Sequence, residues 1–247
     1  MATTDANSSE RRWPTGWNVR HVRETGSTNS DLVELARAGA AHHSVIVTDH
    51  QTAGRGRLDR KWEAPSGVNL LVSFLFRPSS TRPLHDYTHI VGLAARDASN
   101  TVFGVRPDLK WPNDLLIDDR KVAGILAQGG AEFVVVGIGV NVGWAPEGAA
   151  RLGDHIRGSG TELGPLDLLR AMLGEVERFE SLSSAELRSS YESQLSTIGR
   201  RVRVELTNGT IVEGSATGVD DEARLIVRID SGATIAVDVG DVIHLRT

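Results

Sequence analysis

The chain has 247 residues, of which 40% are hydrophobic and 24% are charged, with a formal net charge of −5 at pH 7. This length accommodates a large domain with a small one, and the acidic balance argues against a domain that binds nucleic acid. The chain has no cysteine, no apolar run near the roughly 18 residues of a membrane helix and no signal peptide, so we expect a cytoplasmic protein without disulfide bonds and without DNA or a membrane as partner.

The first two thirds of the chain predict both helices and strands. Residues 1–16 are polar and predict a disordered segment, and a helix capped by Asn29 or Ser30 follows and stops at Gly39. Apolar spacing predicts a second helix over residues 85–101. Apolar runs predict strands over residues 44–51, 69–77, 109–117, 121–129 and 132–142.

The last third changes character near residue 198. Pro165 opens a predicted helix over residues 165–182, and a second helix runs from about Ser184 to Leu195. Short β runs then alternate with turn signals such as Asn208–Gly209, which is typical of a small antiparallel barrel. The sequence therefore predicts a disordered segment at 1–16, a large α/β domain at 17–197 and a β domain at 198–247.

Lysine is rare and clustered in this chain. Only three of the 27 basic residues are lysines, and Lys61, Lys110 and Lys121 all lie near glycine-rich or Trp-Pro-Asn-Asp segments. Lysine is a compact, titratable charge, whereas arginine stays charged and forks onto carboxylate or phosphate. A GC-rich genome explains the arginine excess but explains less well where the lysines remain. We therefore interpret these positions as functional.

Residues 54–60, Gly-Arg-Gly-Arg-Leu-Asp-Arg, combine two glycines with three arginines. The glycines let backbone amides approach a ligand, and the arginines add forked donors for a carboxylate or a phosphate. We expect such a loop to repel itself and to be mobile until an anion binds. The pattern is not a dinucleotide fingerprint, because Asp59 stands at the third glycine position and no βαβ unit surrounds it. A solvated basic loop is the alternative.

A carboxamide and a carboxylate follow Pro112. Asn113 and Asp114 form an oxygen-ligand set suited to Mg²⁺ that carries phosphate, although a turn stabilised by its own side chains is an equal alternative. Lys121 precedes an apolar run, so it can point into a cleft between a carboxylate and a phosphate. It can equally pair with the two aspartates of the preceding turn.

Two further patterns come from glycine and histidine. Residues 137–142, Gly-Ile-Gly-Val-Asn-Val, end an apolar run, so the backbone can approach a ligand and Asn141 can read a base edge; a glycine-bulged core strand is the alternative. His85 and His89 have i, i+4 spacing without the glutamate or third ligand of a zinc site. A surface pair on a helix is the favoured interpretation of these histidines.

Taken in order along the chain, these segments resemble biotin protein ligases. They are GSTN (26–29), HQTAGRGR (50–57), Trp62, KWPND (110–114), KVAGIL (121–126) and GIGVNV (137–142). Each segment is weak alone, but together they are specific and span roughly residues 20–145. The resemblance implies an α/β (α+β) fold, with a class II aminoacyl-tRNA synthetase-like catalytic domain followed by an SH3-like β-barrel.

The resemblance also implies roles for single residues. Biotin would be held by Ser27, Thr28, Asn29, Gln51 and Gly124. The biotin carboxylate and the phosphates would be held by Arg55, Gly56, Arg57 and Lys121, with Lys121, Arg55 and Arg57 acting in catalysis. Trp62 would pack on adenine, and the other nucleotide contacts would be Arg57, Lys110, Asn113 and Asn141. Asp114 would hold the metal.

The implied activity is that of an ATP-dependent, carbon–nitrogen bond-forming ligase that uses Mg²⁺. It would convert biotin to biotinyl-5′-AMP and transfer the biotinyl group to a lysine of a biotin carboxyl carrier protein or domain of acyl-CoA or pyruvate carboxylases. A homodimer is compatible with the resemblance. The Gly-Ser-Thr-Asn segment begins at residue 26, which leaves no room for the N-terminal DNA-binding domain of bifunctional members. We therefore expect the monofunctional type.

Three alternatives stand beside this interpretation. A lipoate or octanoate ligase or transferase shares the catalytic fold but lacks the GRGR loop followed by KWPND in this arrangement. A DNA-binding repressor conflicts with the acidic charge. A ligand-binding module without catalysis is suggested only by Asp59, which stands where the family pattern GRGRxGR has glycine and brings a negative charge into a loop for phosphate.

Overall fold

The structure is a computed structural model that describes residues 13–78, 82–156, 163–238 and 240–245, with Asp59 described by its backbone only. Most of the predicted disordered segment lies outside these residues. Its last part, however, is packed: Trp13 lies against the main core and under the guanidinium of Arg170. The packed chain therefore begins before the predicted boundary at residue 17.

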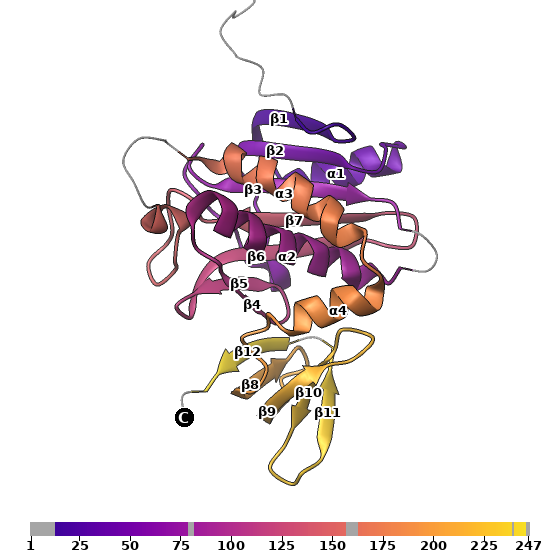
Figure 1. The fold of residues 1–247 in the computed structure, drawn as a ribbon, viewed down its shortest axis with the longest axis vertical. Helices are drawn as coiled ribbons and strands as arrows, with labels where there is room; N and C mark the ends of the chain where they lie inside the picture. Colours follow the sequence, from indigo (N-terminus) through magenta and orange to yellow (C-terminus); the bar gives the residue numbers. More distant parts are fainter. Residues whose placement is uncertain (1–12, 79–81, 157–162, 239, 246–247) are drawn as a thin grey trace, which may run out of the picture.

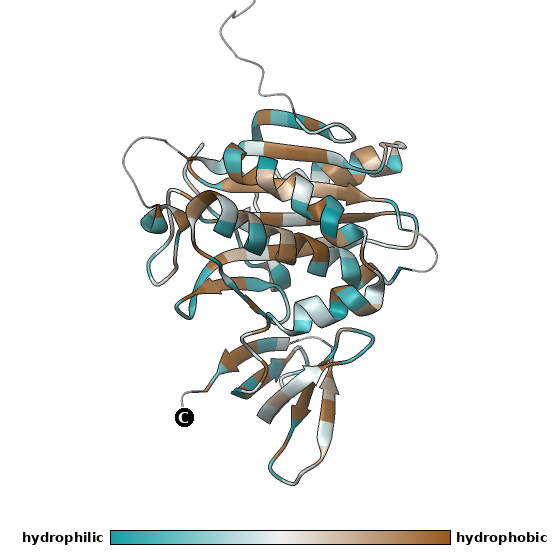
Figure 2. Cartoon of the chain, in the orientation of Figure 1, coloured by the Kyte–Doolittle hydropathy of each residue, from teal (hydrophilic) through white to brown (hydrophobic). Residues whose placement is uncertain are grey.

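A seven-stranded sheet forms the centre of the large domain (Figure 1). Its strands are β1 (Asn18–Thr25), β2 (Ser44–Gln51), β3 (Leu70–Phe76), β4 (Asp108–Lys110), β5 (Asp114–Ile117), β6 (Arg120–Gly129) and β7 (Val134–Val140). They are arranged in the order β1-β2-β3-β7-β6-β5-β4, with β1 and β2 parallel and all other pairs antiparallel. Figure 2 shows many hydrophobic residues along these strands.

Helices cover both faces of the large sheet. The helices are α1 (Thr28–Arg37), α2 (Leu84–Phe103), α3 (Pro165–Glu180) and α4 (Ser184–Glu192). Successive residues of a strand point to opposite faces. On β2, Val45 and Val47 join the main core with α2 and α3, whereas Ile46 between them packs with Leu32 of α1. Among the described residues, the one helix on the face opposite α2 and α3 is the short helix α1, which leaves room for a cavity beside it.

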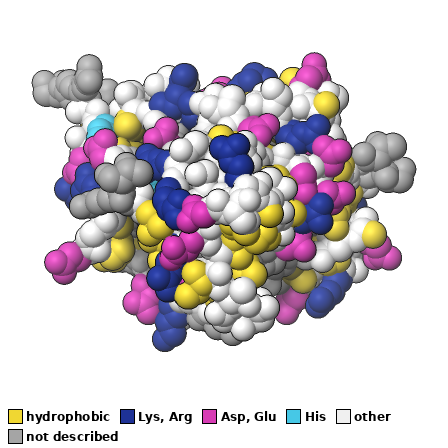
Figure 3. Space-filling model, turned by 90° about the horizontal axis from the view of Figure 1, so that it is seen from below, with side chains coloured by type: hydrophobic (Ala, Val, Ile, Leu, Met, Phe, Trp, Pro, Cys, Tyr) yellow, Lys and Arg dark blue, Asp and Glu magenta, His cyan; other side chains and the backbone are white. Residues whose placement is uncertain are grey.

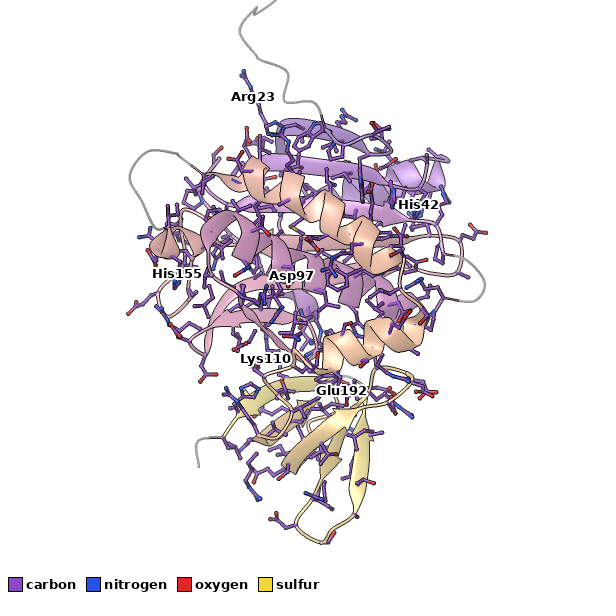
Figure 4. All side chains as sticks on the ribbon, in the orientation of Figure 1. Arg23, His42, Asp97, Lys110, His155 and Glu192 are labelled. Atoms are coloured by element: carbon purple, nitrogen blue, oxygen red, sulfur yellow. The ribbon has the colours of Figure 1, made fainter. Side chains whose placement is uncertain are left out.

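The C-terminal strands form a separate five-stranded antiparallel sheet. They are β8 (Arg201–Leu206), β9 (Ile211–Val219), β10 (Leu225–Arg228), β11 (Thr234–Val237) and β12 (Gly240–His244), in the order β11-β10-β9-β8-β12. The β runs predicted for this region are confirmed. Lys110 and Glu192 lie where the two sheets meet (Figure 4), and the amide of Val219 donates to Glu192 Oε1 at 3.2 Å.

Several predicted boundaries are wrong, for identifiable reasons. The predicted strand at 109–117 is two strands, because Pro112 has no amide hydrogen for the ladder and the chain turns there. The helix α1 begins at Thr28, with Ser27 as its N-cap, rather than after Asn29 or Ser30. Strand β1 is absent from the predicted strands. It lies at the edge of the sheet, and most of its side chains are polar or charged and exposed, so it has no apolar run.

The interpretation of His85 and His89 as a surface pair is also wrong. His89 is buried and its ring stacks on Tyr191 of α4 with centroids 3.7 Å apart. The helix α4 therefore packs against α2 through the contact between these two rings. No helix among the described residues is long and apolar enough to span a membrane.

Candidate functional site

A cavity of about 610 Å³ lies on the face of the large sheet that α2 and α3 leave open, and the C-terminal sheet forms one of its walls. All of the residues that the sequence proposed for the site line this one cavity. They are Ser27, Thr28, Asn29, Gln51, Arg55, Gly56, Arg57, Trp62, Lys110, Asn113, Asp114, Lys121, Gly124 and Asn141. Segments separated by more than a hundred residues thus meet at a single place.

Part of the cavity floor is the backbone of two glycines. Gly139 of β7 and Gly124 of β6 both line the cavity and are cross-strand neighbours in register. The indole of Trp62 lies against both glycines, so a Cβ at Gly139 would overlap Trp62 Cε2, and one at Gly124 would lie 3.1 Å from Trp62 Cζ3. These glycines are required because the ring occupies the space that a side chain would fill.

One end of the cavity is a hydrogen-bonded pocket at the start of α1. The backbone amide of Thr28 donates to Gln51 Oε1 at 2.9 Å, and the Thr28 hydroxyl lies 3.1 Å from the same oxygen. The amide nitrogen of Asn29 donates to the carbonyl oxygen of Leu126 at 3.0 Å. Ser27, Thr28 and Asn29 are all buried, so this end is a hydrogen-bonded polar pocket suited to a small ring with polar groups.

The arginine loop closes over the middle of the cavity. The backbones of Arg55 and Lys61 form an isolated antiparallel β-bridge. Within it, the amide of Gly56 donates to the carbonyl oxygen of Arg60 at 2.6 Å. Arg57 Nη1 donates to Asn113 Oδ1 at 3.1 Å. Leu58 at the turn has a φ of 54°, a left-handed conformation that tightens the loop without glycine.

Basic groups outnumber acidic ones in the cavity. The basic residues are Arg55, Arg57, Arg60, Lys61, Lys110 and Lys121, and the acidic ones are Glu63, Asp114, Glu205 and Asp241. In a chain with a net charge of −5, this is a local positive site for an anion. Lys121 Nζ lies 2.7 Å from Asp114 Oδ1 and 5.7 Å from the Trp62 ring centroid.

Burial makes two of these cations less stable in their charged form. It is the main cause that lowers the pKa of Arg57, against the opposing effect of Asp241 and Asp114. Burial likewise lowers the pKa of Lys110, and the carboxylate of Asp114 opposes that shift. A bound polyanion would stabilise the charged forms of Arg57 and Lys110, which burial disfavours, and this favours binding of phosphate in the cavity.

The side chain of Asn141 is buried and makes its hydrogen bonds within the protein. It is buried, and its amide nitrogen donates to the carbonyl oxygen of Ala150 at 3.0 Å. Its Oδ1 lies 3.5 Å from the amide nitrogen of Asn69. Its contact with nucleotide therefore remains a prediction, and in the structure its side chain joins β7 to the loops beside the cavity.

The C-terminal sheet contributes wall residues that sequence reasoning missed. They are Glu205, Asp241, Val242 and Ile243. Asp241 pairs with Arg60, and the carbonyl oxygen of Gly240 lies 3.5 Å from Arg57 Nη1. Nothing local in the sequence signals these contacts, because they depend on how the two sheets dock. The side chain of Asp59, the one departure from the family pattern, lies outside the described residues.

A second group of possible metal ligands lies outside this cavity. His42 and His43 both approach the carboxylate of Glu180, at 3.3 and 2.8 Å. The amide of Arg77 donates to His42 Nδ1 at 3.1 Å, so neutral His42 carries its proton on Nε2, facing Glu180. The group is therefore a hydrogen-bonded cluster that ties the end of α3 to the segment just before β2. Elsewhere, the face seen from the C-terminal sheet mixes both charge signs (Figure 3).

Comparison with known proteins places this geometry in context. Residues 23–143 match the Biotin/lipoate A/B protein ligase family, and residues 197–245 match the biotin protein ligase C-terminal domain. A biotin–[acetyl-CoA-carboxylase] ligase from Mycobacterium tuberculosis is 36% identical over 94% of this chain and 91% of its own. A ligase of the same name from Paracoccus denitrificans is 31% identical over 87% of this chain and 95% of its own.

A solved structure has the same architecture. The biotin protein ligase from Aquifex aeolicus, in complex with biotin and ATP, superimposes with a TM-score of 0.76 and 26% identity over 93% of this chain and 99% of its own. The superposition therefore includes both the seven-stranded and the five-stranded sheet. The predicted fold, a synthetase-like α/β domain with an SH3-like C-terminal domain, is confirmed.

Proposed function

The chain belongs to the biotin protein ligase family, and on that premise we propose that it uses ATP to join biotin to a lysine of a carboxylase's biotin carrier protein or domain. The observation that carries the proposal is the single cavity. It combines a polar ring pocket at Ser27–Asn29, a cationic middle at Arg57 and Lys121, and an aromatic platform at Trp62. These three regions suit a small ring acid, phosphates and a base.

In the first step, an oxygen of the biotin carboxylate attacks the α-phosphorus of ATP. The bond from that phosphorus to the β-phosphate bridging oxygen breaks, pyrophosphate leaves and biotinyl-5′-AMP forms. Two anions must approach each other, so Lys121, Arg55 and Arg57 act by screening charge and by aligning the reactants. Lys121 suits this role because it lines the cavity with its ammonium beside Asp114 and over the ring of Trp62.

In the second step, the neutral amine of the carrier lysine attacks the acyl carbon of the mixed anhydride. The bond from that carbon to the phosphate oxygen breaks, AMP leaves, and the amine loses its proton as the amide forms. The mixed anhydride is open to hydrolysis, so the loop of residues 54–62 has a reason to cover it until the carrier arrives.

Asp114 fits a magnesium ion that accompanies ATP. Its Oδ1 pairs with Lys121, which leaves the other carboxylate oxygen to hold an ion that binds the protein mainly through one carboxylate and the substrate phosphates. When bound, Mg²⁺ would neutralise phosphate charge. Removing one carboxylate oxygen in Asp114→Asn is expected to raise the Mg²⁺ concentration needed for half-maximal activity, whereas an unchanged requirement would place the ion elsewhere.

The function is tested by transfer to a carrier. The protein is incubated with ATP, Mg²⁺, an apo carrier domain and labelled biotin, lipoate or octanoate in parallel. We expect ATP-dependent label on the carrier with biotin alone, and none on a carrier whose acceptor lysine is replaced by arginine. Transfer of lipoate or octanoate without biotin would favour the alternative activity, against which the match of residues 197–245 to a biotin ligase domain already argues.

A further inference from the structure

A buried hydroxyl lies directly beneath the ring pocket. Ser73 is in the middle of β3, is fully buried, and is not among the residues that line the cavity. Its Oγ lies 2.6 Å from Asn29 Oδ1 and 2.7 Å from Thr28 Oγ1. In a run that is otherwise apolar, this one polar group contacts two neighbouring residues of the pocket without contacting the cavity itself.

Proton counting fixes the direction of these hydrogen bonds. The carbonyl oxygen of Leu126 can only accept, so the end of Asn29 that faces it is the amide nitrogen and the other end is Oδ1. Asn29 Oδ1 can only accept, so the single proton of Ser73 goes there. The contact with Thr28 then requires the Thr28 hydroxyl to donate to Ser73 Oγ at 2.7 Å rather than to Gln51 Oε1 at 3.1 Å, an oxygen that already accepts from the backbone amide of Thr28. Ser73 thereby sets the orientation of both side chains.

The strand register explains why the arrangement is possible. Ser73 of β3, Gly137 of β7 and Leu126 of β6 are direct cross-strand neighbours. Asn29 lies across this row, held by the Ser73 hydroxyl at one side and by the Leu126 carbonyl at the other. A Cβ at Gly137 would overlap Asn29 Oδ1. The row thus holds the Asn29 side chain in place: Ser73 supplies a donor, Gly137 leaves the space, and Leu126 supplies an acceptor.

We propose that Ser73 is a positioning residue for biotin, which holds Thr28 and Asn29 in the orientation that the ring pocket needs, with Gly137 leaving the space for Asn29. The inference rests on the proposed function, because it concerns the biotin end of the same cavity. The hydrogen bonds of the Ser73 hydroxyl are with Thr28 and Asn29, both in the ring pocket, whereas the arginine loop and Lys121 stand at the phosphate end. Losing this hydroxyl should therefore affect biotin and leave ATP almost untouched.

The first experiment measures steady-state biotin transfer by Ser73→Ala. We expect the KM for biotin to rise about tenfold, the loss typical of one buried hydrogen bond, with the KM for ATP and kcat changed less than twofold. The matched control is Ser99→Ala. Ser99 is equally buried, and its hydroxyl donates only to the carbonyl oxygen of Ala95 within α2. An equal rise in both KM values, or the same profile in Ser99→Ala, would reject positioning.

Two further variants separate hydrogen bonding from packing. Ser73→Cys fills the space that Ser73→Ala leaves with a somewhat larger group that bonds only weakly, so we expect it to raise the biotin KM as Ser73→Ala does. A wild-type biotin KM in Ser73→Cys would mean that volume, and not the hydroxyl, matters. Gly137→Ala should give the same biotin-selective rise by displacing Asn29. Its control is Gly174→Ala in α3, where an added Cβ meets nothing within 4 Å.

The outcomes also separate this inference from the proposed function. If the wild-type protein transfers lipoate or octanoate instead of biotin, the function is wrong, and the KM of that acid then tests the role of Ser73. If the wild type transfers biotin and folded Ser73→Ala does so with an unchanged biotin KM, the function stands and the inference fails. A biotin-selective effect in Ser73→Ala, Ser73→Cys and Gly137→Ala supports both.

Discussion

Among single residues, Lys121 joins the two halves of the cavity, because its ammonium contacts Asp114 and lies over the ring of Trp62. We predict that Lys121→Ala lowers the rate of adenylate formation by about 10²–10³, the usual cost of removing one preorganised charge beside a developing anion. Pyrophosphate release with biotin and ATP measures this step. Arg228→Ala, which removes an exposed cation that does not line the cavity, is the control. A folded Lys121→Ala protein with near-normal release would contradict the role.

The floor beneath Trp62 gives a second prediction for a single residue. A Cβ at Gly139 would overlap the indole, so Gly139→Ala should push the Trp62 ring off the sheet and toward water. We expect the tryptophan emission to shift to longer wavelength, and we expect no shift when the substitution is made in a Trp62→Phe background. Gly130→Ala is the control, because a Cβ there meets nothing within 4 Å. A shift that persists without Trp62 would mean a general distortion.

The sequence identifies cavity residues only where the chemistry leaves a local pattern. Lys121 and Trp62 stand in segments whose glycines, prolines and charges are unusual together, so their neighbours point to them. Ser73 is a single hydroxyl within Leu-Leu-Val-Ser-Phe-Leu-Phe, and one serine in a strand carries no such signal. Asp241 is one of many surface acids until the second sheet docks. Residues that act through three-dimensional neighbours were therefore not predictable.

At the level of elements, the loop of residues 54–62 is held by the C-terminal sheet. Asp241 at the start of β12 pairs with Arg60, which offsets the repulsion among the loop arginines that the sequence predicts. We predict that Asp241→Asn speeds hydrogen exchange of residues 54–62 in the ligand-free protein. Because an exposed ion pair contributes only about 0–1 kcal/mol, global stability should hardly change.

The same measurement is made with biotinyl-5′-AMP bound. In that complex the phosphate is expected to bind the loop arginines in place of Asp241. Hydrogen exchange of residues 54–62 should then fall in both wild type and Asp241→Asn, and the difference between the two should disappear. Asp230→Asn serves as the control, since Asp230 pairs with Arg201 in the same sheet but away from the loop. Equal exchange of wild type and Asp241→Asn in the free state would mean that the contact does not restrain the loop.

The packing of α2 against α4 predicts a dependence of stability on pH. Burial lowers the pKa of His89 to about 3, with a further lowering by His85, whereas an unfolded histidine titrates near pH 6.5. The unfolded state therefore binds more protons below that value, and stability falls as the pH drops from about 6.5 toward 3. Between pH 7 and pH 5 the loss from this group is about 2 kcal/mol.

Chemical denaturation at several pH values measures this loss. His89→Phe keeps a ring against Tyr191 and removes the titration, so its stability should fall less steeply between pH 7 and pH 5. The ring nitrogen Nδ1 of His89 has no hydrogen-bond partner among the described residues, which makes phenylalanine a mild replacement. His155→Phe, outside the core, should keep the wild-type slope. Parallel slopes for wild type and His89→Phe would contradict the assignment.

Elements with strong periodicity were predictable, and elements that depend on neighbours were not. The strand at 44–51 and the helix that opens at Pro165 have the predicted starting residues, because an apolar run and a proline at the first helical turn are local signals. Strand β1 has only two valines among its eight residues and becomes a strand by pairing with β2 at the sheet edge. The break at Pro112 is visible in the sequence, and the single strand predicted across it was an error of interpretation.

At the scale of the whole molecule, the two sheets share one core. Val202 and Val204 of β8 belong to the same apolar cluster as Trp111 and Leu195 of the large domain, and Trp111 Nε1 donates to the carbonyl oxygen of Ala223 at 2.9 Å. We predict a single cooperative thermal transition in calorimetry, with equal calorimetric and van't Hoff enthalpies. Two separable transitions would show that the domains unfold independently.

Trp111→Ala tests the same junction. Removing a buried tryptophan typically costs about 3–5 kcal/mol, and here the loss should lower the one transition as a whole. The sequence predicted that a β domain follows the α/β domain, but it could not predict this junction. Docking depends on shape across a surface that only the folded parts possess, and Trp111 carries no sign in the sequence that its partner is more than a hundred residues away.

The glycine floor also limits how the substrate range of this protein can be changed. A wall made of side chains can be trimmed to admit a bulkier acid, but a floor made of main chain offers nothing to remove. Every substitution at Gly124, Gly137 or Gly139 adds atoms to space already occupied by Trp62, Lys121 or Asn29. Variants selected to accept larger analogues should therefore carry their changes in the arginine loop and the C-terminal wall, while these three codons remain unchanged.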